Sequence, residues 1–261
     1  MPLYRTEAIV VGGWDLGEAD RIISFFTRRM GGIRGVAPGA RRGRSRFGGR
    51  LQLLTHGTLV CFAKENWSLY RINEFEPIDS FQTLRFDLDR LSHACYLVEL
   101  VSLLVLEGEI SEEVFLLLLR SLRRLEESGI DLFHAEKAFE AGILRVAGYF
   151  PELEQCMKCK GSLDGESQAF FSAQEGGVLC PKCHDWHHSS CLPLTPSSLA
   201  YLLEAKKGHF RNLLTTSLSE ERRGEISQAM RSHIALILRK NLSTLQFMEQ
   251  LRKSTWGMEM V

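Results

Sequence analysis

The sequence lacks the features that would place it in a membrane or outside the cell. None of its apolar runs reaches the roughly 18 charge-free residues that a membrane-spanning helix needs. The first residues, MPLYRTEAIVV, have neither the basic segment nor the long apolar segment of a secretory signal peptide. We therefore expect the protein to stay in the cytoplasm. The composition, 44% apolar and 25% charged, is ordinary for a globular protein and argues against long disordered stretches.

Common catalytic motifs are also missing. The sequence contains no GxxxxGK[ST] phosphate loop, no GxSxG nucleophile turn and no HExxH zinc-protease motif. Its carboxylates are frequent, but they form no distinctive constellation. These absences favour a binding protein over an enzyme.

The net charge is zero, yet the charged residues are unevenly distributed. Residues 1–50 carry ten Lys and Arg against four Asp and Glu, whereas residues 81–261 carry twenty against twenty-four. Residues 35–51, GVAPGARRGRSRFGGRL, contain five arginines, five glycines and no carboxylate. Arginine is always charged and can donate two parallel hydrogen bonds to a phosphate, and glycine lets a backbone approach closely. The segment therefore indicates a polyanionic partner.

Strand-like patterns and Gly-rich turns predict about five strands within residues 4–78. Gly31-Gly32 predicts a hairpin, and residues 51–63 read as one long strand that bends near Gly57. KEN, residues 64–66, predicts the tight turn to its partner strand. Five short strands in under 80 residues suit a small barrel, and a five-stranded OB-fold barrel is the economical choice. Such barrels bind single strands with basic grooves and aromatic platforms. The candidate platforms are Trp14, Phe47, Trp67 and Tyr70.

From about residue 81 the apolar period becomes helical. One predicted stripe consists of Leu84, Leu88, Leu91, Cys95, Val98 and Val101. Capping residues predict helix starts at Ser111, Asp131, Thr195 and Ser219. Glycines predict helix ends at Gly129, Gly148 and Gly208.

Residues 152–192 are irregular and contain two C-x2-C motifs, CMKC at 156–159 and CPKC at 180–183. Two such turns supply four thiolates to a tetrahedral site, which structural zinc prefers. The predicted zinc ligands are Cys156, Cys159, Cys180 and Cys183. Two alternatives stay open at this point: a pair of reduced motifs without metal, and replacement of one thiolate by a nearby group. The nearby groups are His184, His187, His188 and Cys191. Because four thiolates leave no position for water, the predicted metal is structural.

Several of these segments together resemble one family, the bacterial DNA repair protein RecO. The most specific are GEADR at 17–21, GGIRGVAPGARR at 31–42 and SRFGGRL at 45–51. PELEQCMKC, at 151–159, resembles the entry to the zinc module of that family. The resemblance covers nearly the whole chain and rests on the order and spacing of the motifs.

The resemblance implies an α+β multidomain protein with an OB domain, a helical domain and an inserted four-cysteine zinc module. We expect the OB domain at residues 1–80, the helical domain at 81–150 and 193–261, and the zinc module at 151–192. Carried over by position, the DNA-binding residues would be Arg34, Arg41, Arg42, Arg44, Arg46 and Arg50.

For function, the resemblance implies a recombination mediator in DNA repair that is not an enzyme. Such proteins bind single- and double-stranded DNA and anneal complementary strands. With RecR they help to load RecA onto strands coated by single-stranded-DNA-binding protein, whose C-terminal tail is a further expected partner. A nucleoid-associated, cytoplasmic location is expected. Two other classes stay open: an RNA- or ribosome-associated OB and zinc protein, and a zinc-dependent enzyme of nucleic acids.

Overall fold

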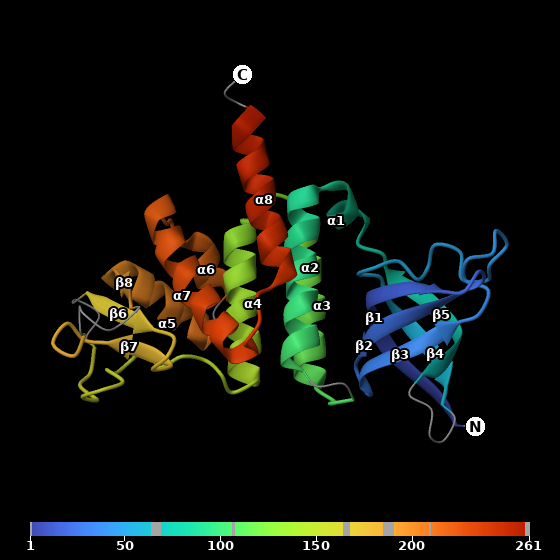
Figure 1. The fold of residues 1–261 in the computed structure, drawn as a ribbon, viewed down its shortest axis with the longest axis horizontal. Helices are drawn as coiled ribbons and strands as arrows, with labels where there is room; N and C mark the ends of the chain where they lie inside the picture. Colours follow the sequence, from blue (N-terminus) through green and yellow to red (C-terminus); the bar gives the residue numbers. More distant parts are fainter. Residues whose placement is uncertain are drawn as a thin grey trace. The chain divides into compact units, whose positions relative to one another are not determined.

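The computed structural model describes residues 2–63, 69–105, 108–163, 168–184, 191–208 and 210–258. The chain divides into two compact units, Met1–Ile130 and Asp131–Val261. The first unit contains strands β1 to β5 and helices α1 to α3 (Figure 1). The second contains a three-stranded sheet, β6 to β8, and helices α4 to α8.

Five strands close into the predicted barrel, in the order β1-β2-β3-β5-β4. They are β1 (Leu3–Leu16), β2 (Asp20–Thr27), β3 (Gly31–Ala37), β4 (His56–Phe62) and β5 (Tyr70–Asp79). All neighbouring pairs are antiparallel except β3 and β5, which pair in parallel. This is the OB-fold connection pattern, and it confirms the predicted fold class.

The predicted hairpin at Gly31 is confirmed, because β2 and β3 pair from Thr27 and Gly31 onward. Gly31 has a φ of +65°, and a Cβ there would lie 2.2 Å from the carbonyl oxygen of Glu109. Only glycine fits this close approach. The predicted bend near Gly57 is also confirmed, as a register shift between His56 and Gly57 in the pairing of β4 with β5.

The prediction that the fourth strand begins at residue 51 is wrong. Residues 38–54 form consecutive turns, and β4 begins only at His56. Leu54 is fully buried and has a φ of +69°, a left-handed conformation that cannot continue a strand. Burial of Leu51 and Leu54 inside the first unit therefore takes precedence over the strand propensity of LQLL.

Helices α1 (Gln82–Phe86), α2 (Leu88–Leu104) and α3 (Glu112–Glu126) complete the first unit. The predicted helical stripe is interrupted at Asp87, which is extended and whose carboxylate accepts from the backbone N–H of Arg90. Leu88 consequently lies at the exposed start of α2. Ser111 caps α3 as predicted, and α3 ends before Gly129, at Glu126.

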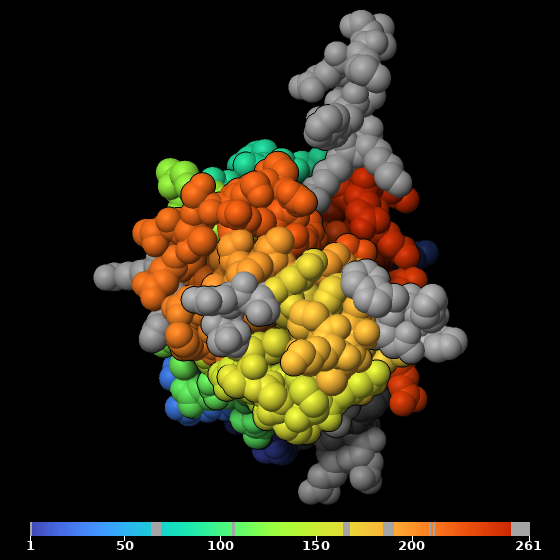
Figure 2. Space-filling model, turned by 90° about the vertical axis from the view of Figure 1, so that its left-hand side faces the viewer, coloured from blue at the N-terminus to red at the C-terminus, as the bar shows by residue number. Residues whose placement is uncertain are grey.

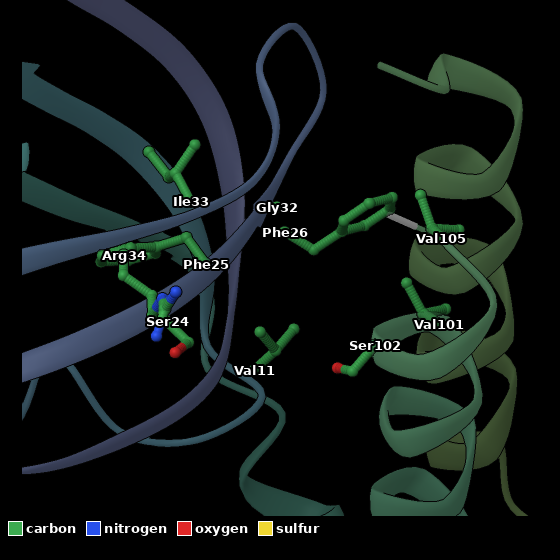
Figure 3. A pocket seen from close by; sticks show the side chains of 10 residues that line it. All are labelled: Val11, Ser24, Phe25, Phe26, Gly32, Ile33, Arg34, Val101, Ser102 and Val105. Atoms are coloured by element: carbon green, nitrogen blue, oxygen red, sulfur yellow. The ribbon is translucent and has the colours of Figure 1, made fainter. Parts of the chain in front are cut away.

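Polar and aromatic contacts join α3 to the barrel. Arg28 forms ion pairs with Glu7 of β1 and Glu112 of α3, and Arg123 of α3 pairs with Asp79 of β5. The ring of Phe26 lies 6.3 Å from that of Phe115 in α3. A small cleft of about 170 Å³ remains between β2, β3 and α2, and the Phe26 side chain points across it toward Val105 (Figure 3). The ion pairs and the ring contact attach α3 to the barrel within the first unit.

In the second unit, α4 (Leu132–Val146) precedes the sheet strands β6 (Ala169–Ser172), β7 (Gly177–Leu179) and β8 (Leu192–Leu194). Helices α5 (Pro196–Lys207), α6 (Phe210–Thr215), α7 (Glu220–Leu238) and α8 (Ser243–Met258) follow. The predicted caps Asp131, Thr195 and Ser219 each accept from a backbone N–H two or three residues on. In Figure 2 the cysteine-bearing segment, in yellow, lies against the orange helices of this unit.

The core of the second unit contains an unusual group of charges. Lys137 is 1% exposed, and its Nζ lies 2.8 Å from a carboxylate oxygen of Glu136 and 2.8 Å from both carboxylate oxygens of Glu140. Burial alone would lower the pKa of Lys137, but the two carboxylates raise it. The ammonium therefore stays charged and offsets much of the cost of burying two carboxylates. Among the described residues, no helix is both long enough and apolar enough to cross a membrane.

Candidate nucleic-acid interface and metal centre

The arginine loop, defined as residues 38–55 between β3 and β4, is an ordered chain of turns. Backbone N–H groups of Arg42, Ser45, Gly48 and Arg50 each donate to the carbonyl three residues earlier. Two apolar side chains of the loop, Phe47 and Leu51, belong to the barrel core together with residues of all five strands. The loop is therefore held by its own turns and by two anchors that enter the barrel.

Polar contacts also attach the loop to the hairpin between β1 and β2. The backbone N–H of Gly39 donates to the carboxylate of Asp20, and that of Arg41 donates to the carbonyl of Ala19. The Arg41 guanidinium donates to the carbonyl of Gly17 and forms an ion pair with Asp15. Near β4, the backbone N–H of Leu54 donates to the carbonyl of Val10, and the backbone N–H of Val10 donates to the carbonyl of Thr55. These contacts set the position of the loop on the barrel surface.

The six sequence-predicted arginines are all exposed, but they differ in their surroundings. Within the described residues, no hydrogen bond or ion pair engages the guanidinium of Arg42, Arg44 or Arg50. Arg46 lies over the Phe47 ring, 4.9 Å from its centroid, and donates to the carbonyl of Ile72. Arg34 is outside the loop, on β3 opposite Ser24.

The candidate stacking residues also differ in how far their rings are exposed. Trp14 is 46% exposed at the end of β1, beside the loop's attachment hairpin, and so keeps a face available to solvent. The prediction that Phe47 offers a stacking face is wrong, because its ring is 2% exposed within the barrel core. Tyr70 is half-buried against that core. Trp67 lies outside the described residues.

Sequence reasoning missed further groups on the same barrel. Arg29 is exposed in the hairpin between β2 and β3, and Arg71 is exposed on β5 opposite Val36 of β3. Tyr4, at the start of β1, lies with its ring 6.1 Å from that of Tyr70. Alternation in YRINEF could have indicated that Arg71 points outward while Ile72 points inward. The pairing of Tyr4 with Tyr70 depends on tertiary structure and has no local signal.

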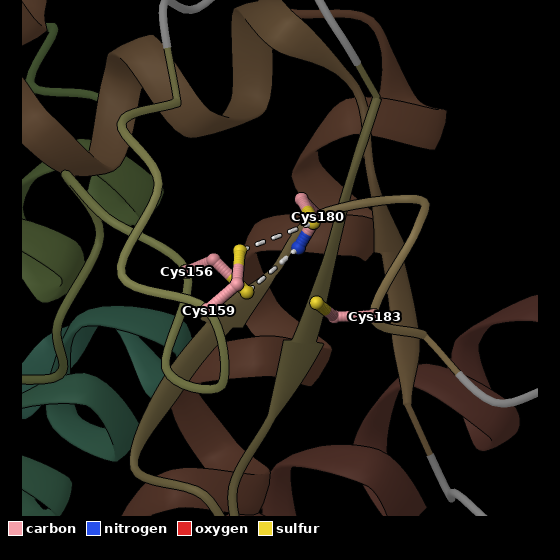
Figure 4. Close-up of side chains that lie close together, drawn as sticks. All are labelled: Cys156, Cys159, Cys180 and Cys183. Atoms are coloured by element: carbon pink, nitrogen blue, oxygen red, sulfur yellow. Dashed lines mark hydrogen bonds between the residues drawn. The ribbon is translucent and has the colours of Figure 1, made fainter.

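Four cysteine side chains converge in the second unit, at the ends of the turns that flank β6 and β7 (Figure 4). The sulfur atoms of Cys156, Cys159, Cys180 and Cys183 all lie within 4.8 Å of one another. The Cys159 and Cys180 sulfurs are 3.8 Å apart. A tetrahedron with metal–sulfur bonds of about 2.3 Å has edges of about 3.8 Å, so this spacing fits a four-coordinate metal ion.

The local backbone supports thiolates at this cluster. Burial works against ionisation of Cys156, but backbone N–H groups of Cys159, Cys180 and Lys158 lower its pKa to about 6. Hydrogen bonds with the Cys159 and Cys180 thiols raise the pKa of Cys183 to about 12. Without a cation between the sulfurs, ionisation is therefore favoured at Cys156 and opposed at Cys183.

The turn after the first C-x2-C motif closes with its backbone hydrogen bond, although one of its residues has a strained backbone conformation. Lys160 stands where many such turns have glycine, and it takes a left-handed φ of +60°. Its backbone N–H donates to the carbonyl of Cys156, and the equivalent N–H of His184 donates to that of Cys180. Both turns thus form without glycine at this position, at a cost of about 1 kcal/mol for Lys160.

The other candidate ligands differ in their placement. His184 stacks on Phe170, with ring centroids 3.9 Å apart and planes inclined by 11°. Cys191 packs against the apolar side of the cluster. Among the described residues, the group that converges with metal-ligand spacing consists of the four cysteines alone. His187 and His188 lie outside the described residues.

Comparison with known families matches both parts of the chain. The family model for the N-terminal part of recombination protein O matches residues 1–81, and the model for its C-terminal part matches residues 85–246. The chain belongs to the RecO family. The OB barrel described above is the N-terminal part of this family's architecture, and the cysteine cluster falls within its C-terminal part.

Full-length relatives carry the same family name. A DNA repair protein RecO from Symbiobacterium thermophilum is 33% identical over 97% of this chain and 100% of its own length. Those from Desulforamulus reducens and a Roseiflexus species are 32% and 34% identical over 98% and 96% of this chain, and over 98% and 87% of their own lengths. Membership of the RecO family makes this chain a DNA repair and recombination protein.

Proposed function

We propose that this chain is a recombination mediator that binds single- and double-stranded DNA and anneals complementary strands without bond-breaking chemistry. The observation that carries the proposal is the arginine loop: its backbone is anchored in an OB barrel, while Arg42, Arg44 and Arg50 project from it. A positioned group of exposed guanidinium groups suits phosphate recognition. Family membership supports a DNA substrate.

The mechanism is electrostatic. Each arginine that neutralises a phosphate releases condensed counterions, so binding weakens steeply as salt increases. Two strands held on one basic surface repel each other less, and complementary bases then meet and pair. Because the loop is anchored by Phe47 and Leu51, little conformational entropy is lost when it binds. No nucleotide hydrolysis is required for any of these steps.

The protein partners in this proposal follow from the family. RecR would act together with this chain to load RecA onto single strands coated by single-stranded-DNA-binding protein, and the C-terminal tail of that protein would be a second contact. Such a mediator would work where the chromosome is repaired, at the nucleoid. The support for these partners is the family match over both parts of the chain.

For the metal centre we propose structural Zn²⁺ held by Cys156, Cys159, Cys180 and Cys183. The sulfur spacing and the all-thiolate ligand set favour zinc among the common metal ions. The ion would cross-link the two C-x2-C turns around β6 and β7. Four thiolates close a tetrahedral shell, so the role we assign is stabilising and not catalytic.

The salt dependence of DNA binding tests the loop. In the variant with Arg42→Ala, Arg44→Ala and Arg50→Ala, the slope of log K against log salt for a single strand should fall by about 2, at about 0.7 per lost contact. A matched control removes three exposed cations elsewhere: Arg120→Ala, Arg222→Ala and Lys240→Ala. It should leave the slope unchanged. Equal slopes in both variants would reject the loop as the DNA site.

A competition experiment distinguishes a DNA-binding protein from an RNA-binding one. Structured RNA should displace a bound DNA single strand poorly at the same salt concentration. If RNA displaced it at much lower concentration than unlabelled DNA, the chain would be an RNA-associated protein and the mediator proposal would be wrong.

A further inference from the structure

The cysteine cluster, defined as Cys156, Cys159, Cys180 and Cys183, is covered unevenly by the rest of the second unit. Cys156 is fully buried, and its sulfur accepts from the backbone N–H of Cys180 at 3.4 Å. Cys180 and Cys183 are partly buried, whereas Cys159 is exposed. Dissolved reagents can therefore reach the sulfur of Cys159 directly.

Glycine at position 161 leaves one side of the Cys159 sulfur open. A Cβ on residue 161 would lie 3.4 Å from that sulfur, in van der Waals contact with it. The carbonyl of Gly161 accepts from the backbone N–H of Cys156, so backbone contacts hold this residue beside the first C-x2-C turn. A side chain at position 161 would thus shield the sulfur without replacing any cysteine.

The sulfur of Cys159 has a partner thiol close by. It lies 3.8 Å from the sulfur of Cys180, across the cluster (Figure 4). A disulfide bond is about 2.05 Å long, so the two sulfurs would have to approach each other by less than about 2 Å. Because the two cysteines belong to different C-x2-C turns, a bond between them would take one metal ligand from each turn.

Two cysteines of the first unit are poorly placed for oxidation. Cys61 is buried in the barrel core, and burial raises the pKa of its thiol to about 11. Burial also raises the pKa of Cys95 in α2. The thiolate is the form of cysteine that reacts, so a thiol with a raised pKa is a poor nucleophile at neutral pH. An oxidant should therefore react with the cluster before it reacts with these two thiols.

We propose that Cys159 and Cys180 form an oxidation site for hydroperoxides, and that the disulfide between them releases the metal ion from the cluster. This inference rests on the structural Zn²⁺ proposed above and adds a means of removing it. When bound, the ion keeps the four sulfurs as thiolates, the form that hydroperoxides oxidise. The two C-x2-C turns would lose their cross-link wherever hydroperoxide accumulates.

The oxidation takes two steps. The thiolate of Cys159 attacks one oxygen of hydrogen peroxide, the O–O bond breaks, a sulfenic acid forms on Cys159 and hydroxide leaves. The thiolate of Cys180 then attacks the Cys159 sulfur, the S–S bond forms, the S–O bond breaks and a second hydroxide leaves. Two thiolates thereby give two electrons to one peroxide. Cys156 and Cys183 remain, and two thiolates do not close a tetrahedral shell.

Treatment of the purified, zinc-loaded full chain with hydrogen peroxide tests this site. A colorimetric zinc indicator should report the release of about one zinc ion per chain. Peptide mapping without reductant should find Cys159 joined to Cys180, with Cys61 and Cys95 still reduced. Dithiothreitol and added zinc should restore the bound metal. Zinc that stays bound, or a first disulfide formed by any other pair, would overturn the assignment.

Gly161→Val keeps every cysteine and adds a side chain beside the Cys159 sulfur. It should bind zinc like wild type and release it about fivefold more slowly, because the oxidation of a thiolate depends on its exposure. Gly161→Ala should show a smaller effect in the same direction. Gln174→Val is the matched control, an exposed position in the turn between β6 and β7, and should release zinc at the wild-type rate. Equal release rates in Gly161→Val and wild type would reject Cys159 as the point of attack.

Failure of the oxidation site can be told apart from failure of the proposed metal centre. Wild-type protein that contains no zinc would contradict the metal centre. A mapped disulfide between Cys159 and Cys180 in that protein would still support the oxidation step, and its absence would reject it. Neither result bears on DNA binding by the arginine loop, which belongs to the first unit.

Discussion

Replacement of Phe47 by leucine should change how firmly the arginine loop is held on the barrel while leaving the charge of the loop unchanged. Phe47 is 2% exposed in the barrel core, so Phe47→Leu should lower the free energy of unfolding by about 1–2 kcal/mol. The same change loosens the loop, and re-ordering even two residues on binding costs about 2 kcal/mol. We therefore expect single-stranded DNA to bind about 10- to 30-fold more weakly. The salt slope should stay at the wild-type value, because every arginine is still present.

The matched control is Phe75→Leu. Phe75 is 2% exposed in the same core but belongs to β5, and so it does not anchor the loop. It should lower stability by a similar amount, measured by urea unfolding, and leave DNA affinity within twofold of wild type. Equal affinity losses in the two variants, or none in Phe47→Leu despite the expected loss of stability, would refute the claim that the anchor preorganises the loop.

Three further outcomes are expected. Lys137→Met should destabilise the protein by about 3–5 kcal/mol in urea unfolding, because it leaves the two contacting carboxylates buried without a cation; a loss under 1 kcal/mol would contradict this. Elemental analysis of purified protein should find about one zinc per chain, and Cys180→Ser should lose it; zinc retained in that variant would place the ion elsewhere. Burial lowers the pKa of His233 below its ordinary 6.5, so the neutral form stabilises the fold above about pH 6.5 and this contribution falls as pH falls toward the folded pKa. In His233→Gln, the free energy of unfolding should fall less steeply between pH 7 and 5 than in wild type, by less than about 1.4 kcal/mol per pH unit. An unchanged dependence on pH would contradict that role.

Much of the fold could be predicted from the sequence because it depends on residues that are close together along the chain. The caps Ser111 and Thr195 act through hydrogen bonds to residues three positions away, so sequence spacing alone identifies them. The same holds for each C-x2-C turn, and the pairing of two such turns in one metal site is a common arrangement. Turn residues between short strands likewise predicted the barrel.

The features that sequence could not supply depend on contacts between distant residues. Phe47 lies among arginines and glycines, and only the closed barrel shows that its ring is an internal anchor. The ion pair of Arg41 with Asp15 joins two hairpins, which gives one predicted DNA-binding residue a structural role. The ring contact of Tyr4 with Tyr70 forms where β1 and β5 come together. No pattern along the chain encodes that proximity.

Annealing of complementary strands tests the central claim most directly. Two complementary oligonucleotides, one carrying a fluorophore and the other a quencher, are mixed with the protein in the absence of any nucleotide triphosphate. The wild-type protein should accelerate annealing well above the spontaneous rate, and the variant with Arg42→Ala, Arg44→Ala and Arg50→Ala should lose most of that acceleration. Annealing at the spontaneous rate with wild-type protein, or undiminished annealing by the variant, would contradict the account.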